Sequence, residues 1–225
     1  MKHFLIAMAA MIGVSFSAQA ATFYVDVNDE GETYVQMIGQ TQRSDEYKLE
    51  IAVLEAQNTY YTVTADVVVD GVVTGTTETE IRREFSNDLY LEGPGGDMIA
   101  GINTAWMVRE MGLNTIASNQ CASACGLVFL GGVERELSDY GSIGFHMPYV
   151  MEAYALNDIK EQVGWLGVQD YMNSSSALFA AFMTYFGLDQ DYLVFFEISQ
   201  IEGTRELFWV DHNNFDLIGK YGRVN

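Results

Sequence analysis

Residues 88–130 decide the fold, and they read DLYLEGPGGDMIAGINTAWMVREMGLNTIASNQCASACGLVFL. The apolar run at 88–91 predicts a buried strand, which leads directly into the Gly-Pro-Gly-Gly turn at 93–96. Apolar side chains at helical spacing follow and predict a helix over 98–112. The chain is therefore expected to pass from strand to helix through a glycine-rich turn.

The second half of this stretch repeats the same order of elements. A short strand predicted at 114–117 is followed by the Cys-Ala-Ser-Ala-Cys run at 121–125 and by an apolar helix through Leu130. Two more short strands are predicted at 134–137 and 143–146. Strands that alternate with helices in this way are typical of an α/β layer fold.

The flanking segments predict further elements of both kinds. Residues 22–40 predict an opening β-hairpin, and 44–57 an amphipathic helix capped by its first residue, a serine. Threonine and valine dominate residues 60–83, which predict a second hairpin with an exposed rim. We expect residues 153–185 to be helical and residues 207–221 to hold a last strand and helix.

The first twenty residues have the layout of a secretory signal peptide, so residues 1–20 are predicted to be removed. Lys2 precedes an apolar stretch at 4–16, and a small residue, Ala20, ends the segment. The apolar stretch is shorter than the roughly 20 residues of a membrane-spanning helix. We therefore expect one mature domain, residues 21–225, located in the periplasm or secreted.

The chain is strongly acidic, with 31 acidic against 11 basic residues and a formal net charge of -20. Loss of the signal peptide removes Lys2 and no acidic residue, which leaves 10 basic against 31 acidic residues and a charge of -21. No basic cluster is present to neutralise phosphates, so nucleic acid, anionic membrane surfaces and CoA are poor partners. Solubility explains the charge more simply than a cationic substrate does.

Ser123 is the candidate nucleophile. A serine becomes nucleophilic when a base takes its proton and fixed donors face the oxyanion that forms. Ser123 lies where a predicted strand meets a helix, so the Ala124 N–H and a glycine N–H from 93–96 are available as donors. Of the two mature histidines, His146 and His212, His146 ends a predicted strand and is the candidate base. Each feature alone is more often structural, but their order together favours catalysis.

Only two cysteines are present, Cys121 and Cys125. Structural zinc needs four ligands, and no further ligand lies at the usual spacing, so we predict neither a metal site nor a cofactor. In an oxidising compartment the pair can form a disulfide, although residues four apart in a regular helix fit that geometry poorly. A disulfide and two buried thiols both remain open.

The order of these motifs resembles that of the proteolytic subunit of Clp protease, in the ClpP/crotonase superfamily. The shared series is strand, Pro-Gly-Gly, helix, strand, small-Ser-small, helix and then Gly-Phe-His-Met-Pro at 144–148. It also resembles secreted Clp-like proteins whose nucleophile lies between two cysteines. The resemblance covers roughly residues 34–224, treats 60–83 as an inserted hairpin, and implies an α/β fold built as a spiral of ββα units.

The resemblance also assigns roles within the site. It implies that Ser123 is the nucleophile and His146 the base, with an oxyanion hole formed by the N–H groups of Gly96 and Ala124. A protein of this kind is a serine hydrolase, most simply a peptidase, that acts on peptide or protein substrates through an acyl-serine intermediate. The superfamily branch that uses a lysine base is disfavoured, because no mature lysine lies in a matching motif.

The third catalytic residue is where the resemblance weakens. The family's acid precedes a late strand, predicted here at 208–210, and Glu202, Glu206 and Asp211 lie near it. Glu202 is our prediction, although Gly203 occupies the position that the acid would take. A Ser–His pair without an orienting acid is a weaker catalyst. The alternative is therefore a weak or inactive relative that holds extended peptides by strand addition.

The family's partners are expected here only in part. An ATP-driven unfoldase would find no ATP in a periplasm, so we predict that the protein acts without one. Clp-like proteins assemble into rings through the helical region that follows the catalytic histidine. An aromatic run at 179–196 can serve such a homo-oligomer or fill the core, and the core is the simpler interpretation.

Overall fold

The structure is a computed structural model, and it describes residues 19–146, 207–213 and 223–224. The predicted signal peptide up to residue 18 lies outside the described residues. The same holds for the predicted helical region over 153–185 with its aromatic run. Cleavage, helix content and ring assembly therefore stay predictions for these segments.

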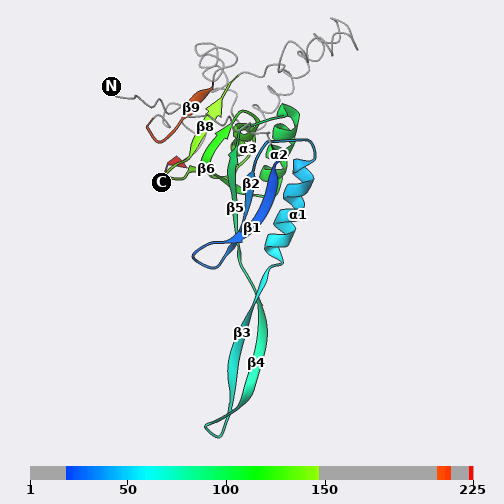
Figure 1. The fold of residues 1–225 in the computed structure, drawn as a ribbon, viewed down its shortest axis with the longest axis vertical. Helices are drawn as coiled ribbons and strands as arrows, with labels where there is room; N and C mark the ends of the chain where they lie inside the picture. The colour runs from blue at the N-terminus through cyan, green and yellow to red at the C-terminus, as the bar shows by residue number, and fades with distance from the viewer. Residues whose placement is uncertain (1–18, 147–206, 214–222, 225) are drawn as a thin grey trace, which may run out of the picture.

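The described chain forms one large mixed sheet with helices packed against it, and a separate hairpin (Figure 1). The large sheet has the order β1-β2-β5-β6-β7-β10, with β8 beside β6 and β9 beside β8. Strands β2, β5, β6 and β7 are parallel, which confirms the predicted α/β class. The elements are β1 (Thr22–Val27), β2 (Thr33–Ile38), α1 (Asp45–Gln57), β3 (Tyr60–Val69), β4 (Val72–Arg82), β5 (Phe85–Gly93), α2 (Met98–Glu110), β6 (Asn114–Ala122), α3 (Ala124–Leu130), β7 (Arg135–Leu137), β8 (Ser142–Phe145), β9 (Phe208–Val210) and β10 (Arg223–Val224).

The core lies between the helices and one face of the large sheet. Alternate residues of the central strands face it, for example Leu89 and Leu91 of β5, both fully buried. Helix α3 is buried along its whole length, as its uniformly apolar sequence requires. The turn that precedes α3 is therefore held between the sheet and a buried helix.

Helix α1 starts differently from the prediction. Ser44 has a φ of 74°, and its hydroxyl caps none of the described N–H groups, so the predicted serine cap is wrong. The Asp45 carboxylate instead holds the segment that leads into the helix, because it accepts a hydrogen bond from the Gln42 N–H at 2.8 Å. Its other oxygen lies 2.7 Å from Lys48 Nζ, which compensates for the complete burial of the carboxylate.

Strands β3 and β4 form a hairpin that projects away from the large sheet (Figure 1). Their register joins Tyr60 to Arg82 at the base and Val69 to Val72 at the tip. The predicted hairpin is thus present, and every residue of its two strands is exposed. An isolated two-stranded hairpin adds little stability in water.

Removal of the hairpin should leave the domain folded. The Arg83 N–H donates to the Thr59 carbonyl oxygen at 2.8 Å, so the two ends of the hairpin already lie side by side. We expect replacement of residues 61–81 by two glycines to change the melting temperature by less than about 5 °C. Circular dichroism against the full chain measures this, and a fall of about 15 °C or loss of cooperative unfolding would show that the hairpin belongs to the core.

The sheet face opposite the core carries a pair of tyrosines. The ring centroids of Tyr34 and Tyr90 lie 4.8 Å apart, and the Tyr34 hydroxyl donates to Asp26 at 3.4 Å. Burial and then the Asp26 carboxylate raise the pKa of Tyr34, while burial and then Asp88 raise the pKa of Tyr90. Both shifts favour the neutral phenol in the folded state. Their contribution to stability is complete below the ordinary tyrosine pKa and is lost as pH rises through the raised values.

We expect Tyr34 and Tyr90 to ionise later than exposed tyrosines in an alkaline absorbance titration. The Tyr34→Phe/Tyr90→Phe variant should lack the late part of the curve, because burial keeps these two phenols neutral. Tyr140→Phe is the control, since Tyr140 is 85% exposed and its loss should leave the burial of Tyr34 and Tyr90, and so the late part of the curve, unchanged. A late phase that persists in the double variant would contradict this assignment.

Candidate functional site

Ser123 lies in the turn between β6 and α3. Its φ of 53° and ψ of -120° are rare for a residue other than glycine and cost about 1–3 kcal/mol. The surrounding backbone holds the turn, because the Ser123 N–H donates to the Gly144 carbonyl oxygen at 2.7 Å. The Ser123 carbonyl oxygen accepts from the Leu127 N–H at 3.3 Å. A sharp strand-to-helix turn of this kind displays a serine hydroxyl outside the helix and the strand.

His146 comes directly after β8, at the edge of the sheet where Ser123 lies. Strand β8 is parallel to β6, with Ala122 opposite Gly144, so both strands end side by side. The distance from His146 Nε2 to Ser123 Oγ is 2.7 Å. In the tautomer with an unprotonated Nε2, the imidazole accepts the hydrogen of the serine hydroxyl. The structure therefore brings the predicted nucleophile and base into hydrogen-bond contact.

The Pro-Gly-Gly turn packs directly against Ser123. Gly95 has a φ of 94°, and a Cβ atom there would lie 2.5 Å from Ser123 Cβ and 2.6 Å from the Ala122 carbonyl oxygen. Gly96 has a φ of 151°, and a Cβ atom there would collide with the Thr41 carbonyl oxygen. Close backbone approach and backbone angle both require glycine at these two positions.

The two predicted oxyanion donors lie beside this contact. The Thr41 N–H donates to the Gly95 carbonyl oxygen at 2.9 Å, and the Asp97 N–H donates to the Thr41 carbonyl oxygen at 3.0 Å. In a parallel bridge of this kind the N–H of the intervening residue, Gly96, points away from Thr41. Ala124 is the first residue of α3, so its N–H has no acceptor within the helix. Neither N–H donates to a backbone oxygen of the described residues, so both stay candidate donors to an oxyanion.

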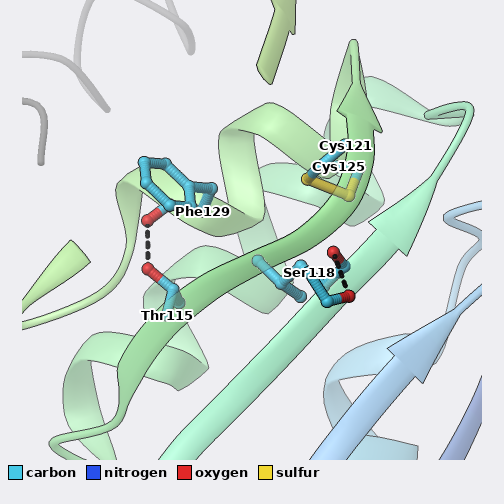
Figure 2. Close-up of a disulfide and its surroundings, with 6 residues drawn as sticks. Thr115, Ser118, Cys121, Cys125 and Phe129 are labelled. Carbon is cyan, nitrogen blue, oxygen red and sulfur yellow. Dashed lines mark hydrogen bonds between the residues drawn. A yellow bond between two sulfur atoms is a disulfide. The ribbon is translucent and has the colours of Figure 1, made fainter. Parts of the chain in front are cut away.

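A disulfide joins Cys121 to Cys125 (Figure 2). Ser123 lies midway between them in the chain, inside the short loop that the bond closes. Both cysteines are buried, and their Cα atoms lie 5.2 Å apart. Cys121 lies near the end of β6, Cys125 lies in the first turn of α3, and the Ser123 turn separates them. The two cysteines are therefore not in one regular helix, and their spacing of four fits a disulfide. Of the two alternatives left open by the sequence, the structure has the disulfide.

The far end of α3 is fixed by side chains from its neighbours. The Thr115 hydroxyl of β6 donates to the Phe129 carbonyl oxygen at 2.7 Å (Figure 2). Arg109 of α2 donates to the carbonyl oxygens of Gly131 at 2.8 Å and Gly132 at 2.6 Å. These bonds satisfy carbonyl groups at the C-terminal end of α3, where a helix has no partners of its own.

A groove of about 640 Å³ adjoins the turn at the ends of β2, β5 and β6. Trp209 of β9 forms one wall and packs on Gly144, where an added Cβ atom would lie 3.0 Å from the indole ring. Glu92 is the charged residue among its described lining residues, which are otherwise apolar or neutral. Side chains that line it include Tyr24, Ile38, Glu92, Pro94, Ala122 and Trp209.

Two other basic side chains bind elsewhere. His212 Nε2 donates to the Ser138 carbonyl oxygen at 2.7 Å. Lys48 Nζ donates to Asp45 at 2.7 Å and to the Ala21 carbonyl oxygen at 3.3 Å. Within the described residues, His146 is therefore the basic side chain that contacts Ser123.

The candidate acids are described only in part. Asp211 follows β9, and its carboxylate accepts a hydrogen bond from the Asn213 N–H at 2.8 Å. Glu202 and Glu206 lie outside the described residues. Strand β9, which follows them in the chain, pairs antiparallel with β8 and so lies next to the strand that leads to His146. The role of Glu202 stays a prediction.

The described residues hold neither a metal-binding cluster nor a membrane-spanning helix. Their His, Cys, Asp and Glu side chains form no group of three or more that could hold a metal ion. Their helices include none that is long and apolar enough to cross a membrane. Neither finding extends to the segments outside the described residues.

Comparison with known proteins finds similarity at the level of the fold. No protein-family model and no curated protein matches the chain. The structure of ClpP1 from Listeria monocytogenes is similar with a TM-score of 0.46 and 16% identity, over 85% of this chain and 89% of that one. A point mutant of ClpP1 from the same organism gives a TM-score of 0.39 and 18% identity, over 62% of this chain and 74% of its own. At this identity the likeness concerns the fold alone.

The sequence prediction missed two residues that shape the site. Gly95 was assigned to a turn, but its contact with Ser123 was not expected. Gly144 accepts the Ser123 N–H and gives room to the ring of Trp209. A glycine inside a strand often marks the close approach of another group, so the sequence could have predicted such a contact at Gly144. The contact of Gly95 with Ser123 could not be predicted, because it depends on the tertiary structure that places the glycine-rich turn beside the end of β6.

Proposed function

We propose that the protein is a serine hydrolase, most simply a peptidase, that acts through an acyl-Ser123 intermediate. The observation that supports this most directly is the 2.7 Å contact between His146 Nε2 and Ser123 Oγ. A structural serine has no need of a positive φ, whereas a nucleophile gains from being displayed at a sharp turn. The N–H groups of Gly96 and Ala124, which donate to no backbone oxygen of the described residues, fit the same chemistry.

In the proposed reaction, Ser123 Oγ bonds to the substrate carbonyl carbon while its proton passes to His146 Nε2. The carbonyl oxygen becomes an oxyanion, which the N–H groups of Gly96 and Ala124 stabilise. The imidazolium then gives its proton to the leaving nitrogen or oxygen as that bond breaks. Water, deprotonated by the same imidazole, hydrolyses the ester. We propose Glu202 as the acid that orients His146.

The groove beside the turn is the proposed binding site for an extended peptide. Tyr24, Ile38 and Trp209 favour apolar side chains, and the carboxylate of Glu92 favours a neutral or basic substrate over an acidic one. We further propose that the enzyme acts in the periplasm or outside the cell, without an ATP-driven unfoldase, and that it forms a homo-oligomer.

The test is turnover of a panel of short peptides and activated esters by the mature protein. Ser123→Ala should lower kcat/KM at least about 10³-fold, because it removes the nucleophile. Ser118→Ala is the matched control, since Ser118 lies in β6, the strand that leads to Ser123, and donates to the Leu91 carbonyl oxygen at 3.2 Å. Equal turnover by Ser123→Ala would refute the proposal. Peptide binding without turnover, unchanged in Ser123→Ala, would favour a peptide-binding protein.

The exported protein should begin at Ala21. Ala21 is buried, and its nitrogen donates to the Gln40 carbonyl oxygen at 2.8 Å, a contact that a new amino terminus can keep. Intact mass of protein from the periplasm or medium of a bacterial host measures this. Ala20→Glu should accumulate the uncleaved precursor, because the cleavage site needs a small residue. A full-length chain confined to the cytoplasm would contradict the proposed location.

A further inference from the structure

We propose that the Cys121–Cys125 disulfide is a positioning element for the nucleophile: it holds the turn that directs Ser123 Oγ at His146. The inference rests on the proposed function, and it assigns to the disulfide a part in that reaction. The two cysteines flank the serine at equal spacing, and each belongs to a different element, β6 and α3. The covalent bond therefore closes directly across the reactive turn.

The turn needs such a restraint because its backbone is unfavourable. A serine at a φ of 53° relaxes to a common conformation unless its surroundings prevent it. On the sheet side, Cys121 is paired with Gly93 of β5 and Ile143 of β8, so its position is fixed. On the helix side, the Leu127 N–H reaches the Ser123 carbonyl oxygen at 3.3 Å, which is a long hydrogen bond. The helix side is therefore the weaker one.

Helix α3 cannot supply this restraint alone. It has seven residues, and a helix this short depends on its contacts for stability. Hydrogen bonds from Thr115 and Arg109 hold its C-terminal end, whereas the first turn, next to Ser123, is held by its packing against Gly101 of α2 and by the disulfide. The bond from Cys125 to Cys121 ties that first turn to the fixed strand. Reactive geometry at Ser123 thus depends on a covalent link whose two cysteines each lie two positions from the serine.

Two other roles for the disulfide fit the structure less well. A disulfide that closes a very short loop restricts the unfolded chain less than one that closes a long loop, so general stabilisation is a weak reason for it. Cys121 and Cys125 are 0% and 1% exposed, so thiols and reductants have little access in the folded state. A regulatory exchange with solvent is therefore disfavoured, and local positioning remains.

The experiment compares wild type with the Cys121→Ala/Cys125→Ala variant. The first readout is the rate at which a small fluorophosphonate labels Ser123, measured at conditions where both proteins are fully folded. We expect the variant to label at least tenfold more slowly. The control is Val53→Ala, which truncates a buried residue of α1 far along the chain from the turn and should keep the wild-type labelling rate. Equal labelling of wild type and double variant would overturn the inference.

The second readout does not depend on activity. Hydrogen exchange of the Ser123 and Leu127 amides reports whether the turn is held, because these N–H groups bond to Gly144 and Ser123. We expect at least tenfold faster exchange of both amides in the double variant, with Leu89 and Leu91 of β5 unchanged. Unchanged exchange at Ser123 and Leu127 overturns the positioning role, whereas absence of labelling in wild type refutes the proposed function instead.

If the double variant does not fold, protein without the disulfide can be obtained from wild type by reduction. Wild type is unfolded, reduced with a phosphine and refolded, and two free thiols per chain confirm the loss of the disulfide. We expect the same local increase in exchange as in the double variant, and a return to wild-type exchange when the pair is reoxidised. Reduced protein that exchanges like oxidised protein at Ser123 and Leu127 also overturns the inference.

Discussion

Replacement of His146 by alanine should lower the rate of Ser123 acylation by about 10²- to 10⁴-fold. The imidazole lies 2.7 Å from Ser123 Oγ, and its removal leaves the hydroxyl without the base that takes its proton. The folded state should persist, because the substitution follows the end of β8 and leaves the strand pairing intact. The rate of labelling by a fluorophosphonate, with circular dichroism as a check on folding, measures the effect.

His212→Ala is the matched control for this substitution. His212 is exposed and donates to the Ser138 carbonyl oxygen, so its loss should leave the acylation rate within about twofold of wild type. An acylation rate unchanged in His146→Ala would remove the base from the proposed reaction. A large loss of rate in His212→Ala alone would show that His212, and not His146, is the base.

Replacement of Gly95 by alanine should be severely damaging, although it leaves both reactive side chains in place. The new Cβ atom would lie 2.5 Å from Ser123 Cβ and 2.9 Å from the Ala124 nitrogen, at a φ of 94°. The turn must move, and a shift of about 1 Å between reacting groups costs roughly 10²-fold in rate. Stability should fall by about 1–3 kcal/mol as well.

Gly112→Ala separates the two effects of Gly95→Ala. Gly112 has a φ of 69°, but an added Cβ atom there meets no atom within 4 Å. We expect it to lower the free energy of unfolding while the folded protein keeps its labelling rate. Chemical denaturation and labelling of both variants give the two quantities. Equal labelling of Gly95→Ala and wild type would show that the turn at Ser123 tolerates displacement.

The alternating elements of the central region were predictable because their signals are local. Apolar spacing marks β5 and α2, and the glycine-rich turn between them marks the change from strand to helix. The end of β6 was not predicted: the strand continues to Ala122, beyond the expected end at residue 117. Polar residues at 118–120 hide the strand pattern, and pairing with β5 and β8 on either side extends it.

The site was predictable as a set of residues but not as a geometry. Motif order pointed to Ser123 and His146, which lie 23 positions apart in the chain and in contact in the structure. The φ of Ser123, the packing of Gly95 and the choice between disulfide and free thiols depend on how separate segments meet. No local pattern encodes such contacts, since they are set by tertiary packing.

The most direct measurement is peptide mapping of the mature protein after reaction with a fluorophosphonate. The predicted result is one adduct per chain, located on the peptide that contains Ser123 and absent from Ser123→Ala. Slow labelling in His146→Ala under the same conditions would accompany it. An unmodified Ser123 peptide in the folded wild type, or an adduct on another serine that persists in Ser123→Ala, would contradict the assignment of Ser123 as the nucleophile.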